Sequence, residues 1–220
     1  MITMTVRSMR VSEKWRPLRA FAVAVLIAGT ATLGAAAAAA DCATTEVVVA
    51  RGTGEPGVLG AVIGDPLYET LTARLPGALT AHAVRYPANL LVPTSISDGT
   101  AEMARHVISA AAHCPDQRFV LVGYSQGAIV VHGVLGTPTV TALPGTHTLP
   151  GSFESSIAAI LLFGDPLETV GPGVPAPYAQ RTGHYCAGGD PICGAGVVSA
   201  AHTEYGWAMD SAADFVAARL

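Results

Sequence analysis

The stretch RFVLVGYSQGAIVVHGVL, from Arg118 to Leu135, decides the fold class. It begins as a continuous apolar run, typical of a strand buried on both faces of a sheet, and ends as an apolar helix. The pentapeptide between them, GYSQG (Gly123 to Gly127), has the pattern Gly-x-Ser-x-Gly. Between a strand and a helix, this pattern predicts a sharp turn that exposes the Ser125 hydroxyl, while the glycines avoid clashes with neighbouring segments.

Strand-like and helix-like segments alternate on both sides of this stretch. Further strands are predicted over residues 45–51, 81–87 and 156–166, and helices over residues 65–75, 98–114 and the carboxyl end. Continuous apolar strands separated by helices predict a parallel sheet with helices on both faces, which is an α/β fold. Functional residues are then expected just past the carboxyl ends of the strands.

The first forty residues have the pattern of a signal peptide. Five basic residues precede an apolar run from Ala20 to Leu33, and small residues follow it from Gly34 to Ala40. We therefore expect a signal peptide over residues 1–40 and a secreted domain over residues 41–220, found outside the cell or at the cell wall. A membrane anchor is the alternative, but the apolar run is short for a bilayer span, so no stable span is expected after cleavage.

The predicted mature domain is acidic. Without residues 1–40 it keeps 7 arginines and no lysine against 15 acidic residues, a formal charge of about −8 compared with −4 for the whole chain. This balance argues against nucleic acid or an anionic membrane surface as partner. A domain of this length has room for one ample core, and we expect a monomer.

Four cysteines lie beyond the predicted leader: Cys42, Cys114, Cys186 and Cys193. An even number in an exported chain favours two disulfides, for which three pairings exist. The simplest pairing joins the last two cysteines and leaves the first two to each other. A zinc site formed by the last two with His184 and His202 is the alternative. Six residues separate those cysteines, which is not the usual spacing of zinc ligands, so we expect no metal or organic cofactor.

A serine nucleophile needs a base and an acid that orients it. In folds with this serine turn the chain order is serine, acid, histidine. Three Gly-Asp-Pro tripeptides supply candidate acids, at Asp65, Asp165 and Asp190. His202 is the one histidine beyond all three, and it is expected where the last helix opens. We therefore favour His202 as the base, with His184 as its rival.

The three aspartates differ in their surroundings. Asp65 precedes Ser125 and is expected to cap a helix. Asp165 follows a predicted strand, while Asp190 lies between Cys186 and Cys193, inside the expected disulfide ring. Because a small ring would hold a carboxylate in place, the residues favour Asp190 and leave Asp165 open.

Several motifs together resemble the cutinase family of serine esterases, which includes lipid esterases and acetylxylan esterases. They are GYSQG, CAGGDPIC (Cys186 to Cys193), AHTEY (Ala201 to Tyr205), ARGTGE (Ala50 to Glu55) and LLFGDP (Leu161 to Pro166). The resemblance spans Cys42 to Tyr205 and implies a small α/β-hydrolase with a five-stranded parallel sheet and two disulfides. It also implies a triad of Ser125, Asp190 and His202, and a structural role for Asp165.

Hydrolysis through an acyl-serine also needs donors for the developing oxyanion. The residue after the nucleophile, Gln126, is expected to supply one backbone N–H. The family resemblance places the second donor at Thr53, and the alternative is that Thr53 is a turn residue between two glycines.

Two apolar loops are expected to flank the serine, over residues 86–95 and 194–201. Their candidate acyl-binding residues are Leu90, Leu91, Val92, Val197 and Val198. The alternative is that these side chains are half-buried anchors of the loops. Apolar loops suit fatty acyl, lipid or polyester esters, whereas a sugar site would need more amides than the single asparagine, Asn89, provides. The sequence thus favours a secreted serine esterase. An acetylxylan deacetylase, an acyltransferase and a non-catalytic lipid- or envelope-binding scaffold are the alternatives.

Overall fold

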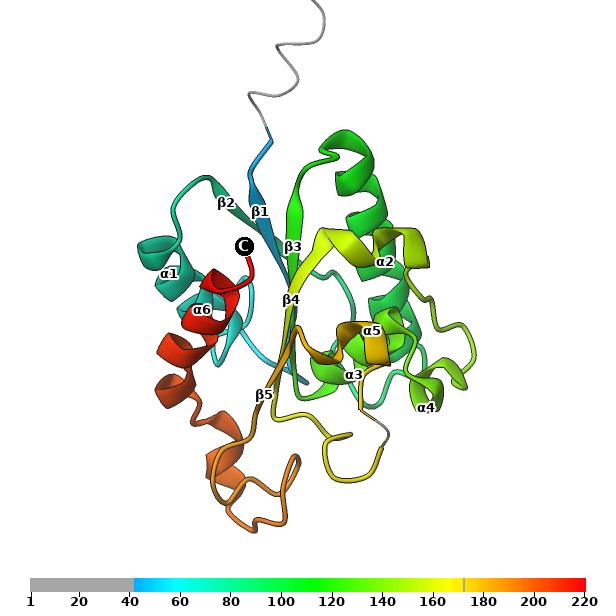
Figure 1. Ribbon diagram of the computed structural model, residues 1–220. Coiled ribbons are helices and arrows are strands. Elements are labelled where there is room, and N and C mark those ends of the chain that lie inside the picture. Colours follow the sequence, from blue (N-terminus) through cyan, green and yellow to red (C-terminus); the bar gives the residue numbers. More distant parts are fainter. Residues whose placement is uncertain (1–41, 172) are drawn as a thin grey trace, which may run out of the picture. The chain divides into compact units, whose positions relative to one another are not determined.

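The computed structural model describes residues 42–171 and 173–220 (Figure 1). The predicted signal peptide and its expected cleavage point near Asp41 lie outside the described residues. Within the described part of the chain, no helix has both the length and the apolar character needed to cross a bilayer.

The centre of the domain is a five-stranded sheet in the order β2-β1-β3-β4-β5. All neighbouring strands run parallel. The strands are β1 (Thr45–Ala50), β2 (Leu79–Ala83), β3 (Arg118–Tyr124), β4 (Ile157–Phe163) and β5 (Thr182–Tyr185). The expected α/β fold with a five-stranded parallel sheet is confirmed.

Helices cover both faces of this sheet (Figure 1). On one side lie α1 (Gly64–Arg74) and α6 (Met209–Ala217), and on the other α2 (Ser95–His113) and α3 (Gln126–Leu135). Alternate residues of β1 enter the two cores, with Val47 on the α1 side and Val48 on the α2 side. The short helices α4 (Pro138–Thr141) and α5 (Ala176–Ala179) follow α3 and precede β5. Burial on both faces explains why the central strands are continuous apolar runs.

The main differences from the sequence prediction occur where the chain is polar. Helix α2 begins three residues before its predicted start at Asp98. The Asp98 side chain lies in the first turn and accepts a hydrogen bond from Thr94 Oγ1 at 2.9 Å. Asp65 likewise lies within α1, where its carboxylate accepts the N–H of Leu59 at 3.0 Å. His202 lies in a 3₁₀ turn, Ser199–Thr203, and does not open the last helix.

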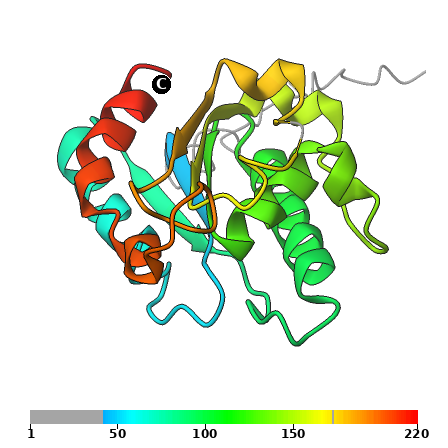
Figure 2. The ribbon, with the colours of Figure 1, turned by 90° about the horizontal axis from the view of Figure 1, so that it is seen from below.

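The structure contains two disulfides. Cys42–Cys114 joins the segment before β1 to the end of α2, and Cys186–Cys193 closes a ring just after β5. The second ring directly follows β5, so it lies at the carboxyl ends of the parallel strands, where the loops that follow β1 and β4 also gather (Figure 2). This end of the sheet is where an α/β fold places its functional residues.

Candidate active site

Ser125 occupies the sharp turn between β3 and α3. Its backbone has φ 55° and ψ −118°, and Ala88 is the one other non-glycine residue of the described chain with positive φ. Neighbouring glycines are required, because a Cβ on Gly127 would lie 1.9 Å from the carbonyl oxygen of Ala50, and one on Gly123 would lie 2.6 Å from Ala128 Cα. This strained turn holds the serine at the end of the strand.

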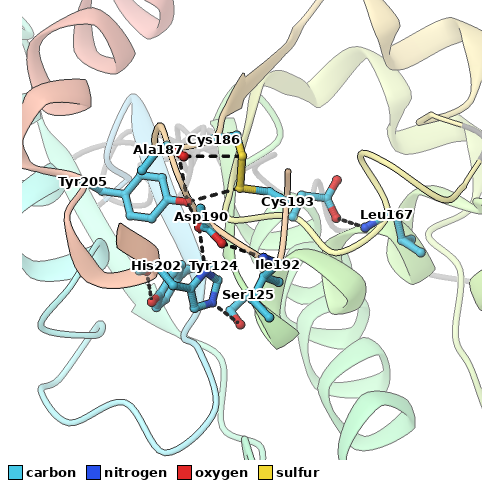
Figure 3. The surroundings of a disulfide bond; sticks show 11 residues. Tyr124, Ser125, Leu167, Cys186, Ala187, Asp190, Ile192, Cys193, His202 and Tyr205 are labelled. Atoms are coloured by element: carbon cyan, nitrogen blue, oxygen red, sulfur yellow. Dashed lines mark hydrogen bonds and ion pairs between the residues drawn. A yellow bond between two sulfur atoms is a disulfide. The ribbon is translucent and has the colours of Figure 1, made fainter. Parts of the chain in front are cut away.

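Three of the predicted residues form one chain of hydrogen bonds (Figure 3). His202 Nε2 lies 2.9 Å from Ser125 Oγ, and His202 Nδ1 lies 2.7 Å from Asp190 Oδ2. Because an ionised carboxylate only accepts, Nδ1 carries the proton and Nε2 is left to accept the serine O–H. The His202 side chain is 17% exposed while that of Asp190 is fully buried, so solvent reaches the serine end of the chain and not the carboxylate.

The Asp190 carboxylate has donors on both oxygens. Oδ1 accepts the N–H of Ile192 at 2.7 Å, and Oδ2 accepts the Tyr205 hydroxyl at 2.6 Å as well as His202. Burial raises the pKa of this carboxyl, but the hydrogen bonds from Tyr205, His202 and Ile192 outweigh burial, so the pKa lies below its ordinary value. The group is therefore an anion beside the imidazole at neutral pH.

Asp165, the rival acid, has different partners. Its Oδ2 lies 2.8 Å from His132 Nε2 in α3, and its Oδ1 accepts the N–H of Leu167 at 2.9 Å. His132 Nδ1 in turn lies 2.9 Å from Thr137 Oγ1. The side chains of this pair are 1% exposed. It is a buried link between the end of β4 and α3, and the rival base His184 lies exposed on β5.

The loop after β1 is organised by a carboxylate that sequence reasoning did not single out, Glu55. It accepts the N–H groups of Gly52 at 2.6 Å, Val62 at 2.7 Å and Ile63 at 3.4 Å. Burial raises the pKa of Glu55, although these three hydrogen bonds oppose the effect. The one sequence signal for this role is the position of Glu55 in the ARGTGE motif.

The two expected oxyanion donors lie in neighbouring segments. Thr53 is at the exposed tip of the Glu55 loop, and Gln126 is the first residue of α3, where backbone N–H groups have no partner within the helix. The start of the loop abuts α3, because a Cβ on Gly127 would lie 2.8 Å from the carbonyl oxygen of Arg51. The Gln126 side chain is buried, and its Oε1 accepts the Ser95 hydroxyl at 3.2 Å.

Backbone hydrogen bonds tie one apolar loop to the Glu55 loop and the other to the disulfide ring. Gly54 N–H donates to the carbonyl of Ala88 at 2.8 Å, and Val198 N–H donates to the carbonyl of Gly189 at 3.0 Å. Four of the five candidate acyl-binding side chains are exposed, with Leu91 at 89% and Val197 at 90%, and Val92 is half-buried. Most of them are therefore not buried anchors.

A metal centre at the ring would need thiolate ligands. Among the described residues, Glu168 lies close to both Cys186 and Cys193, but the two sulfurs are bonded to each other. Of the two histidines considered as ligands from the sequence, His202 bridges Ser125 and Asp190, and His184 is exposed on β5. These residues do not form a zinc site in this state.

A parallel sheet covered on both faces, with a strained serine after a central strand and a histidine delivered from a late loop, is the architecture of the α/β-hydrolases. The model of the family described as Cutinase matches residues 41–220. The chain therefore belongs to the cutinase family.

Similar proteins include enzymes with different names. The chain is 40% identical to a cutinase of Kineococcus radiotolerans over 71% of its own length, and it spans only 53% of that relative. It is 39% identical to the phospholipase Culp4 of Mycobacterium tuberculosis, over 91% of this chain and 88% of the relative. A solved cutinase of Trichoderma reesei, in complex with a phosphonate inhibitor, is 34% identical with a TM-score of 0.65, covering 80% of this chain and 75% of that one.

Proposed function

We propose that this chain is a secreted serine esterase that hydrolyses carboxylic esters through an acyl-serine. The observation that supports this most directly is the hydrogen-bonded chain from Ser125 through His202 to Asp190. In the proposed reaction, Ser125 Oγ attacks the ester carbonyl while His202 Nε2 accepts its proton and returns it to the leaving alcohol. Water then cleaves the acyl-enzyme with His202 again as base, and Asp190 keeps the imidazole in the required tautomer.

The oxyanion formed in each step is assigned to the backbone N–H groups of Thr53 and Gln126, with the Thr53 hydroxyl as a further donor. Donors that are fixed before the reaction stabilise the developing charge without reorganisation. The Glu55 carboxylate supports this assignment, since it fixes the loop that carries Thr53.

Fatty acyl, lipid or polyester-like esters are the proposed substrates. The support is the group of exposed apolar side chains on the two loops, Leu90, Leu91, Val197 and Val198. Relatives named as a cutinase and a phospholipase agree with this class. Export is proposed because disulfides persist in oxidising compartments and residues 1–40 have the pattern of a leader, and we propose a monomer.

The test is an activity profile of the purified protein. p-Nitrophenyl esters of increasing acyl length, a phospholipid and acetylated xylan are compared, and a fluorophosphonate probe reports the reactive serine. We expect labelling and a preference for acyl esters over acetylated xylan. Preference for xylan would indicate a deacetylase, product transfer to an added alcohol in place of water would indicate an acyltransferase, and no labelling would indicate a binding scaffold.

Replacing Glu55 with glutamine is expected to lower kcat by about 10- to 100-fold with little change in KM. This loss of kcat is no larger than that expected from removing one oxyanion donor. The amide keeps one acceptor oxygen, but its NH2 group would face a backbone N–H that now meets the second carboxylate oxygen, and the loop would lose its fixed shape. Steady-state kinetics on a short p-nitrophenyl ester measures the effect. Glu69→Gln, on the exposed face of α1, is the control for charge. Unchanged kcat in Glu55→Gln would contradict the role of the loop.

Removing one disulfide should mainly lower activity, and removing the other should mainly lower stability. Chain entropy gives about 2.5 kcal/mol for the short ring of Cys186–Cys193 and about 4.4 kcal/mol for the long loop of Cys42–Cys114. Only the short ring encloses Asp190. We expect the double serine variant of the short ring to lose more turnover, and that of the long loop to lose more unfolding free energy. Full turnover without the short ring would contradict its proposed role as the mount of the acid.

A further inference from the structure

Tyr205 is a buried residue beside the active site to which the proposed mechanism assigns no role. Its side chain is 1% exposed, and it lies three residues after His202 in the AHTEY motif. The ring packs edge-on against Tyr124, with centroids 5.9 Å apart, and against Phe163 at 5.8 Å. These contacts hold the aromatic ring in one place, so its hydroxyl has a fixed direction.

The hydroxyl has one proton, and its neighbours determine where that proton goes. Tyr205 Oη lies 2.6 Å from Asp190 Oδ2, 3.5 Å from Cys193 Sγ and 3.5 Å from the backbone N of Ala187 (Figure 3). The Ala187 N–H donates to the hydroxyl oxygen, and a disulfide sulfur is at best a weak acceptor. The proton is therefore directed at Asp190, on the same oxygen that accepts from His202 Nδ1 at 2.7 Å.

We propose that Tyr205 is a positioning residue of this active site, whose buried hydroxyl fixes the Asp190 carboxylate and sets how strongly that carboxylate attracts the proton of His202. The inference rests on the proposed function, because it assigns Tyr205 a part in the same serine–histidine–aspartate reaction.

Two consequences follow from removing this hydroxyl. The carboxylate would keep the Ile192 N–H on one oxygen and His202 on the other, but it would lose a donor in a site that water does not reach. Its negative charge would then be shared with one donor fewer, so the imidazolium form of His202 would be held more strongly. Activity that needs the neutral imidazole would begin at a higher pH.

The other groups around Asp190 do not replace this donor. Tyr124 is a neighbour in the same aromatic cluster, but its hydroxyl donates to the carbonyl of His202 at 2.5 Å. Glu168, which interacts electrostatically with Asp190, is an exposed acid and adds negative charge. Burial raises the pKa of Asp190, and the Tyr205 hydrogen bond is the foremost of the groups that lower it.

The test is the Tyr205→Phe variant, which keeps the packed ring and removes one oxygen. We expect the plateau of kcat/KM to fall about tenfold. We also expect the acid limb of the pH profile to move up by about 0.5 to 1 pH unit, because the free energy of one hydrogen bond to a charged group is only partly transferred to the protonation of the histidine. Tyr185→Phe is the matched control. Tyr185 is buried in the same core, stacked on Phe163, and its hydroxyl interacts with Ser211. Its acid limb should stay at the wild-type position.

A lower rate with an unmoved acid limb in Tyr205→Phe would overturn the proposal, because lost packing alone lowers the rate at every pH. Proton NMR of the wild-type protein gives a second readout that needs neither the variant nor turnover. Two downfield protons are expected on Asp190 Oδ2, from His202 Nδ1–H and Tyr205 O–H, and a single one would also overturn the proposal. Both protons in a protein without esterase activity would instead count against the proposed function.

Discussion

Ser125→Ala is expected to lower kcat for short p-nitrophenyl esters by about 10⁶-fold and to abolish labelling by a fluorophosphonate. In the proposed mechanism Ser125 forms the covalent bond to the substrate, and removing the nucleophile of such a triad has an effect of this order. The residual rate, about 10³ above that in water, comes from oxyanion donors and substrate binding, which the variant keeps.

Loss of the fold would not explain such a result. The Ser125 hydroxyl has His202 as its hydrogen-bond partner, and the backbone strain at φ 55° is the same for alanine. Melting temperature should therefore change little. Ser156→Ala is a matched control, since its hydroxyl donates to the carbonyl of Phe153 at 2.7 Å just before β4 begins. Hydrolysis by Ser125→Ala at a rate near that of the wild type would rule out the acyl-serine mechanism.

The turn at Ser125 could be predicted from sequence because the Gly-x-Ser-x-Gly motif lies in one short stretch between a strand and a helix. Gly123 is required by its contact with Ala128, next to the motif, whereas Gly127 is required by the backbone of Ala50 and Arg51 at the distant end of β1. The motif therefore carries a long-range contact in its own residues. Strands β1 and β3 were predicted to within one residue, since both are buried on each face. Strand β5 was not recognisable from its residues, because it is only four residues long (Thr182–Tyr185) and is partly exposed. The family resemblance alone implied a fifth strand.

The residues around the proposed triad depend on contacts between distant parts of the chain. Chain order favoured His202 but left His184 as a rival, and it did not separate Asp190 from Asp165. The difference between them is that Asp165 is paired with His132, 33 residues earlier in the chain, and this pairing leaves no pattern in the sequence. Glu55 and Tyr205 have partners nearer in the chain, backbone N–H groups within eight residues and a carboxylate 15 residues earlier. These contacts form only in the fold, so they leave no pattern in the sequence either.

Exchanging each of the two aspartates for asparagine separates a role in catalysis from a role in stability. Asp190→Asn is expected to lower kcat by about 10⁴-fold, because an amide N–H facing His202 Nδ1 would move the imidazole proton to Nε2, where the serine proton has to go. The variant keeps oxygen and nitrogen atoms for the Ile192 N–H and Tyr205, so its fold should remain.

Asp165→Asn is expected to show the reverse. It replaces the charged acceptor of two buried hydrogen bonds, from His132 and from the Leu167 N–H, and hydrogen bonds to a charged group each contribute about 1.5 to 3 kcal/mol to the unfolding free energy. The Asp165 carboxylate accepts hydrogen bonds from His132 and Leu167 and not from His202. The variant therefore keeps the proposed nucleophile and its base, and its folded fraction should keep a kcat within about tenfold of the wild type. The measurements are kcat on folded protein and chemical denaturation of both variants. A 10⁴-fold loss in Asp165→Asn with full activity in Asp190→Asn would assign the acid to the strand-end Gly-Asp-Pro and leave the disulfide ring with a structural role only.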